Sequence, residues 1–195
     1  KYGSIRTSLT HVYNKGQWPN EKLNKITYTV SGDMKYKKFR QILAAALAAV
    51  AAGEEDPARP LNTLVIKSLD VTPLSKRPSR NEQENALYNG LTPLEIGSGD
   101  TVQIVRAITT YTKNAAGTDD VSLLDLTTIR TLDYVRKACD TRISLRFPRE
   151  KLSSRTAGKV RSELLDVLYK LEDLEIIEAV DDNKAMLIVE RDSQD

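Results

Sequence analysis

The chain has 195 residues, of which 40% are apolar, so it can bury the core of one large domain or of two small ones. Its 29 Lys and Arg residues nearly balance 27 Asp and Glu residues, and a net charge of +2 gives no general attraction to nucleic acid or to an anionic membrane. A single cysteine, Cys139, excludes an internal disulfide, and a single histidine, His11, excludes an imidazole cluster for a metal. We therefore expect a globular protein, made in a reducing cytoplasm, with no cofactor and no metal.

Neither a membrane anchor nor a secretion signal is expected. The longest apolar run, residues 42–52, is too short to span a bilayer, and the first residues lack the layout of a signal peptide. The sequence begins at Lys1 without a methionine and ends just after a strand-like run. We expect a fragment of a longer protein, cut at both ends.

The first part of the chain predicts a strand, a helix and a second strand. Residues 24–33 alternate apolar and polar side chains like a half-buried strand, and residues 61–69 resemble a fully buried one. Between them, residues 35–55 predict an alanine-rich helix that packs closely against a sheet. Its apolar face comprises Phe39, Ile42, Leu43, Ala46, Leu47 and Val50. This order favours a parallel βαβ unit.

The next elements are a short helix and a long strand. Ser79 is a helix-capping residue and Gly90 a helix stop, so a helix is expected between them. The sequence GSGD, residues 97–100, predicts a turn, and residues 101–112 are the longest strand candidate. Residues 113–120 are polar and without periodicity, which makes them the expected domain boundary.

The last part predicts two helices with strands around them. Residues 122–142 predict a helix whose apolar stripe is Ile129, Leu132, Val135 and Cys139. The stretch RISLRFPREKL, residues 142–152, alternates like a strand that carries Ile143, Leu145 and Phe147 on one side. After Pro148, residues 153–176 predict a helix with capping serines and a stripe of Val160, Leu164, Leu168 and Leu171. Residues 175–180 and 185–192 predict a closing hairpin.

No convincing catalytic arrangement is present. A Ser-His-Asp triad needs an imidazole base, and His11, in a terminal stretch, is interpreted as a surface or packing residue. Cys139 lies on an apolar stripe, where a buried thiol is favoured over a nucleophile. The GSGD turn lacks the following helix of a phosphate-binding loop. Neighbouring carboxylates are expected to be solvated rather than catalytic; these are Glu54 with Glu55, Asp119 with Asp120, and Asp181 with Asp182.

Basic side chains lie off the apolar stripes of the last two predicted helices. They are Arg130, Arg136 and Lys137 on the first helix, and Lys159, Arg161 and Lys170 on the second. Two interpretations stay open. The basic residues form a docking surface, or they belong to solvated faces balanced by acidic neighbours, namely Glu163, Asp166, Glu172 and Asp173.

Four segments closely resemble the tail sheath protein of Mu-like contractile phages, a family related to R-type pyocin sheaths. They are residues 55–66, 80–96, 101–152 and 185–192. The resemblance implies an α/β fold. A central mixed sheet with flanking helices, the subtilisin-like core of the sheath domain, would occupy residues 1–114. A smaller C-terminal α/β domain of two helices packed on a short sheet would occupy residues 115–195, without its terminal arm.

The same resemblance implies a mechanical function. The protein would be a non-enzymatic structural subunit that polymerises around the tail tube and contracts to drive the tube through the host envelope. Its partners would be other copies of itself in stacked rings, the tail tube protein, and baseplate and tail terminator proteins, with no nucleic acid and no membrane insertion. It would reside in the virion, and in the host cytoplasm during assembly. The six basic residues would be candidates for contact with the tube or a neighbour.

Two departures and two alternatives accompany this resemblance. Family members tend to carry a Thr-Pro pair between the RFPR segment and the last helix, and residues 150–164 have no proline. The family's terminal arm is also missing.

The alternatives are a small α/β hydrolase that uses cryptic carboxylates, and a nucleic-acid-binding module. The latter is disfavoured by the near-neutral charge and by an aromatic content of only 6%.

Overall fold

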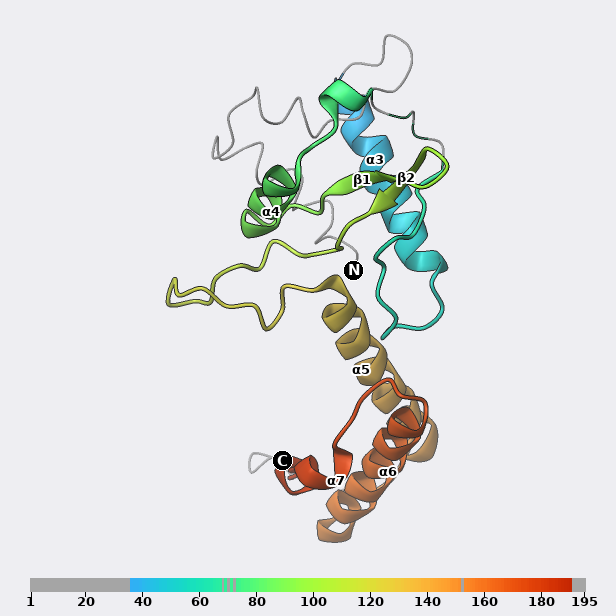
Figure 1. Ribbon diagram of the computed structural model, residues 1–195. Helices are drawn as coiled ribbons and strands as arrows, with labels where there is room; N and C mark the ends of the chain where they lie inside the picture. The colour runs from blue at the N-terminus through green and yellow to red at the C-terminus, as the bar shows by residue number, and fades with distance from the viewer. Residues whose placement is uncertain (1–35, 68, 70, 72, 152, 191–195) are drawn as a thin grey trace. The chain divides into compact units, whose positions relative to one another are not determined.

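The computed structural model describes residues 36–190 apart from positions 68, 70, 72 and 152 (Figure 1). The described residues form two compact units. Unit 1 comprises residues 36–55 and 59–128, and unit 2 comprises residues 56–58 and 129–190. The strand expected at residues 24–33 and the histidine at position 11 lie outside the described residues.

The alanine-rich helix of unit 1 is confirmed as α3, Tyr36–Gly53. Leu47 and Ala51 are buried on its inner face, and Leu43, Ala46 and Val50 pack against the same core. The core is completed by residues from the segments that follow: Leu61, Ile66, Leu94, Val102, Ile104, Ala107 and Leu126.

The sheet of unit 1 is a two-stranded antiparallel hairpin of β1, Leu94–Gly97, and β2, Thr101–Ile104 (Figure 1). Leu94 pairs with Ile104 and Gly97 with Thr101, so the predicted GSGD turn is confirmed. The strand predicted at residues 61–69 is wrong as a regular strand, because a turn interrupts it and, among its described residues, only Val65 is in a ladder position. Val65 forms an antiparallel bridge with Gln103 of β2.

Backbone hydrogen bonds show how this irregular segment borders β2. The Thr63 amide donates to the Ile104 carbonyl over 2.8 Å, and the Ile66 amide donates to the Val102 carbonyl over 2.8 Å. Leu61 and Ile66 are buried, as predicted, and the segment borders β2 in an antiparallel sense. The parallel pairing expected between residues 24–33 and 61–69 stays a prediction, because residues 24–33 lie outside the described residues.

The long strand predicted at residues 101–112 ends at Ile104. Beyond it, the backbone changes hydrogen-bonding partners: the Val105 amide donates to the Pro93 carbonyl, and the Thr109 amide donates to the Leu124 carbonyl. A β-ladder needs one continuous partner strand, so alternation of side chains alone overestimated the length. Residues 105–125 form an irregular loop that folds back on itself. An ion pair between Arg106 and Asp125, at 2.8 Å, joins the two ends of this loop.

Both expected ends of the short helix α4, Arg80–Tyr88, are confirmed. Ser79 and Glu82 form a capping box that satisfies two backbone amides. At the other end Gly90 adopts a φ of 71°, and the Leu91 amide donates to the Ala86 carbonyl over 2.9 Å. This is a Schellman motif, which favours glycine. A short 3-10 turn, η1, Leu74–Lys76, precedes α4.

Unit 2 begins along α5, Leu126–Arg146. The predicted strand RISLRF is wrong, because residues 142–146 continue this helix and Phe147 still donates to the Ile143 carbonyl over 2.9 Å. Ile143 and Phe147 are four residues apart, a spacing that fits a helix as well as a strand. Pro148 then disfavours helical backbone at the residue before it and ends the helix.

The second helix of unit 2, α6, Ser154–Asp173, is confirmed with its serine cap at Ser153. The closing hairpin is wrong: residues 175–179 form no strand, and the chain continues as α7, Val180–Asn183, and a 3-10 turn η2, Lys184–Met186. The Val180 amide donates to a Glu172 carboxylate oxygen over 2.9 Å, which fixes the start of α7. No strand occurs in the described part of unit 2.

Candidate interaction surface

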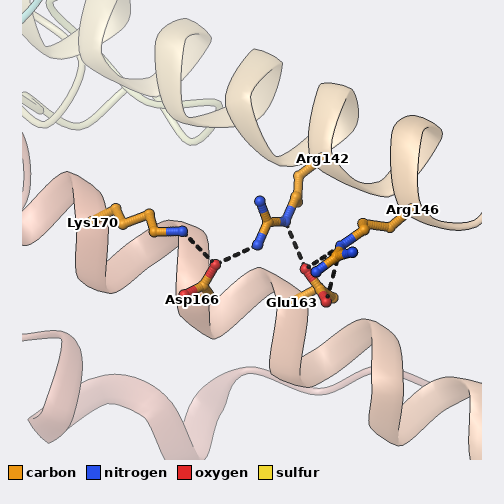
Figure 2. Close-up of polar contacts among 5 residues, drawn as sticks. All are labelled: Arg142, Arg146, Glu163, Asp166 and Lys170. Atoms are coloured by element: carbon orange, nitrogen blue, oxygen red, sulfur yellow. Dashed lines mark hydrogen bonds and ion pairs between the residues drawn. The ribbon is translucent and has the colours of Figure 1, made fainter.

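Arg142 joins α5 to α6 through two carboxylates (Figure 2). Its Nε donates to Glu163 over 2.6 Å, and its terminal nitrogen donates to Asp166 over 2.5 Å. Arg146, one turn further along α5, reaches Glu163 at 3.3 Å, and Lys170 binds Asp166 at 2.8 Å. We call these five residues the clasp. Spacings of three and four residues place the members on facing sides of the two helices.

The clasp shifts the pKa of each of its carboxylates in the same direction. The hydrogen bond from Arg142, supported by Arg146, lowers the pKa of Glu163. The hydrogen bond from Lys170 lowers the pKa of Asp166, with further help from the nearby arginine charges. Both acids are therefore ionised at neutral pH, and the side chains remain partly exposed, with 22% of Glu163 and 44% of Asp166 accessible.

A second set of polar contacts holds the C-terminal segment against α6. Arg161 donates to the Lys184 carbonyl over 2.7 Å and to the Leu187 carbonyl over 3.0 Å. The Tyr169 hydroxyl donates to Asp181 over 2.7 Å, which raises the pKa of Tyr169. Met186 and Ile188 nevertheless remain exposed at 71% and 72%. The segment is fixed by polar atoms, while much of its apolar surface faces solvent.

The structure does not bring the six predicted basic residues together. Arg161 is bound to backbone carbonyls, and Arg130 lies 3.4 Å from the Asp56 carbonyl. Arg136 pairs with Asp133 along α5, and Lys159 pairs with Glu150. Lys170 belongs to the clasp. The side chain of Lys137 is exposed, and Arg136, Lys159 and Lys170 also keep more than half of their side-chain surface accessible.

Sequence reasoning missed the clasp. It placed Arg142 on the polar side of a strand, and it treated Glu163 and Asp166 as general balancing charge. The spacing between Arg142 and Arg146 could have indicated a helix face, as could the spacing between the two acids. Which face of α6 meets which face of α5 depends on the length of the connection, which spacing alone does not determine.

The residues tested for chemistry have structural contacts. Cys139 is partly buried, and burial raises the pKa of its thiol above the usual value. Asp120 accepts a hydrogen bond from the Tyr111 hydroxyl at 2.7 Å, and Asp181 pairs with Lys184 at 2.7 Å. Within the part of the chain that the structure describes, no three potential metal ligands gather. Nor does any helix there combine the length and hydropathy that a membrane span requires.

Unit 1 carries a shallow hollow of about 400 Å³ between α4 and the segment that follows β2. Tyr88 and Val121 line it and are exposed at 81% and 73%. Its charges are of both signs: Arg106 is paired with Asp125, and Lys113 lies 3.8 Å from Asp119. An open, mixed surface of this kind fits a protein contact better than an enclosed substrate site.

Comparison with known families gives matches along most of the chain. Residues 23–110 match the phage tail sheath protein central domain, and residues 118–195 match the phage tail sheath C-terminal domain. A curated relative, the Mu-like prophage FluMu tail sheath protein of Haemophilus influenzae, is 36% identical over 186 residues. The match covers 89% of this chain and 38% of that protein, so the chain spans well under half of the relative's length.

Solved structures show the same fold at lower identity. The sheath tail protein of Desulfitobacterium hafniense has a TM-score of 0.55 at 18% identity, covering 72% of this chain and 32% of that one. The sheath tail protein of Listeria innocua has a TM-score of 0.53 at 17% identity, covering 69% and 31%. A chain of the anti-feeding prophage baseplate has a TM-score of 0.52 at 16% identity, covering 69% and 34%. The mixture of helices with a small antiparallel sheet agrees with these folds. The two family matches and the similarity to the Haemophilus influenzae protein show that the chain belongs to the phage tail sheath family.

Proposed function

We propose that the protein containing this chain is a structural subunit of a contractile tail sheath. The observation that carries the proposal is the match to both sheath domains in their order along the chain, together with 36% identity to a Mu-like sheath protein. Subunits polymerise around the tail tube and contract to drive it through the host envelope. The energy comes from many modest interfaces that change together, with no enzymatic step in the subunit.

The division into domains is part of the same proposal. Residues 1–114 belong to a subtilisin-like α/β core with a central mixed sheet, and residues 115–195 to a C-terminal domain. The buried cluster around β2 and α3 supports a core for the first of these ranges, to which Leu126 of the second range also contributes. In this proposal the subtilisin-like label describes topology and carries no protease activity.

The partners follow from the sheath architecture. We propose contacts with other copies in stacked rings, with the tail tube, and with baseplate and terminator proteins, in the virion and, during assembly, in the host cytoplasm. The baseplate similarity of the anti-feeding prophage chain supports an association of this fold with such assemblies. For the tube contact, exposed Arg136 and Lys137 on α5 are better candidates than Arg130 and Arg161, whose guanidinium groups bind carbonyls within unit 2.

The test is the assembly state of the longer subunit beside that of this chain. Light scattering gives the mass of each in solution, and negative-stain microscopy shows whether the longer subunit forms rings or tubes. Tubes or rings are the expected result. A longer subunit that stays a small discrete species at high concentration would contradict the proposal.

The tube contact has its own variant. Arg136→Glu with Lys137→Glu should impair assembly of the longer subunit on the tube, because it replaces two exposed positive charges with negative ones. Unimpaired assembly of that variant would remove α5 from the tube contact while leaving the sheath function intact.

A further inference from the structure

Unit 2 has opposite charges at the two ends of α6. Near its N-terminal end, the connection from α5 and the first turns carry basic residues; these are Arg146, Arg149, Lys151, Arg155 and Lys159, with Glu150 as the acid among them. Near its C-terminal end, residues 172–182 contain acidic residues and no basic one; these are Glu172, Asp173, Glu175, Glu178, Asp181 and Asp182. We call these sets the basic pole and the acidic pole.

Much of this charge is not used inside unit 2. Arg149, Lys151 and Arg155 are exposed and make no ion pair with the described residues. The same is true at the acidic pole, where the exposed acids without an ion pair in the described chain are Asp173, Glu175, Glu178 and Asp182. Lys159 and Glu172, the members of the two poles that are nearest along α6, are 13 residues or about 20 Å apart, which is beyond the range at which exposed charges neutralise each other at physiological salt.

The stability of α6 does not account for this order of charges. A helix dipole favours acidic residues at the N-terminus and basic residues at the C-terminus. The first turn of α6 has Arg155 and no acid, and its last turn contains Glu172 and Asp173 beside one basic residue, Lys170. Within α6, Arg155 at the start and Glu172 and Asp173 at the end therefore oppose the helix dipole, whereas Arg146 at the end of α5 and Asp181 and Asp182 at the start of α7 agree with the dipoles of those helices.

Each pole also contains an exposed leucine. Leu145 follows the basic side of α5 and is 75% exposed, while Leu174 ends α6 among the acids and is 63% exposed. A large apolar side chain surrounded by charges of one sign is typical of a contact in which the apolar group anchors and the charges select the partner.

We propose that the acidic pole of one copy binds the basic pole of a second copy, head to tail. The occupant of each pole is thus the opposite pole of the same protein, as the complementary charges indicate. A head-to-tail contact is heterologous, so its repetition produces rings or helical filaments rather than closed dimers. The inference rests on the proposed sheath function and identifies one of its self-contacts.

Charge exchange tests this contact in the full 195-residue chain. One variant reverses the basic pole with Arg149→Glu and Arg155→Glu, and another reverses the acidic pole with Glu175→Lys and Glu178→Lys. Sedimentation velocity at low ionic strength, over a range of concentrations, measures self-association. We expect wild-type association that high salt weakens, and association at least about tenfold weaker in each single-pole variant. Mixing the two variants should restore it, because their poles are again complementary.

The matched control reverses the same number of charges outside both poles, with Lys67→Glu and Arg80→Glu in unit 1, and should associate like wild type. Circular dichroism checks that every variant retains its helices; if a reversal unfolds the chain, Arg149→Gln with Arg155→Gln replaces it. Unchanged association in both pole variants, a mixture that fails to associate, or a monomeric wild type would overturn the inference. If the longer subunit with reversed poles still forms tubes, the contact is removed and the sheath function stands.

Discussion

The buried apolar side chains of the described residues lie mostly in unit 1, and only Pro57, Val167, Leu171 and Val180 belong to unit 2. Unit 1 places α3 and two strands around a closed core, with Ile104 completely buried. In unit 2 many apolar side chains of α5 and α6 are only half-buried, and polar contacts, including the clasp and those of Arg161, join its elements. Because apolar burial is the dominant favourable term in folding, we expect unit 2 to have less intrinsic stability than unit 1.

The ends of two helices repeat this difference on a smaller scale. Helix α4 ends in a Schellman motif with Gly90 in the left-handed position. Helix α6 ends in the same motif, with the Ile176 amide donating to the Leu171 carbonyl, but its left-handed residue is Glu175 at a φ of 58°. Unit 1 has glycine, the residue that this left-handed backbone favours. Unit 2 has Glu175, which is strained in this conformation and whose charged side chain is exposed.

The largest expected effect comes from the core of unit 1. Ile104→Ala should reduce the free energy of unfolding by about 2–5 kcal/mol, because it leaves a cavity among tightly packed neighbours. Leu145→Ala, at an exposed position of unit 2, should change it by no more than about 0.5 kcal/mol. Urea unfolding of both variants measures the difference. Equal losses would show that the two units do not differ in the way described.

The two helix ends predict effects of opposite sign. Gly90→Ala should destabilise by about 1–2 kcal/mol, since a side chain is strained at this φ. Its Cβ would also lie 3.3 Å from the Thr110 backbone. Glu175→Gly should stabilise by about 1 kcal/mol, because it relieves that strain. Thermal unfolding compares the pair. The glycine variant should at the same time weaken head-to-tail association, and a loss of stability in it would contradict the assignment of strain.

Acid should affect unit 2 through the clasp, with the smallest effect of the three. The folded-state pKa values of Glu163 and Asp166 are lowered, so their contribution is fully present above the unfolded values of about 4.3 and 3.9 and is lost as the pH falls through the lower folded values. Hydrogen exchange of amides in α6 should therefore accelerate below about pH 4, after correction for the intrinsic rate.

The control for this effect removes the clasp's central cation. In Arg142→Gln the two carboxylates lose the charge that favours their ionised forms, so the acid-dependent part of the opening should shrink. Amides around β2 in unit 1 serve as the internal reference. An identical acid profile in wild type and variant would show that the clasp does not govern the opening of α6.

Local signals predicted helices well and strands poorly. Ser79 and Gly90 fixed α4 because capping chemistry acts within a few residues. Alternation failed at residues 101–112 and at residues 142–147, because a strand also needs a partner that local sequence does not identify. Basic side chains could be predicted as exposed. The pairing of Arg142 with Glu163 could not, because it depends on the register between two helices. The attachment of Arg161 to distant carbonyls likewise depends on how the C-terminal segment packs on α6.

That attachment has a consequence for how the surface can change in evolution. Among the described residues, Arg161 donates hydrogen bonds to main-chain oxygens of residues 184 and 187, and these bonds do not depend on which side chains that segment carries. Met186 and Ile188 can therefore be exchanged for other residues without loosening the segment's position. The backbone fixes the position of this surface, while its side chains can change. Related proteins could therefore bind different partners with the same backbone framework.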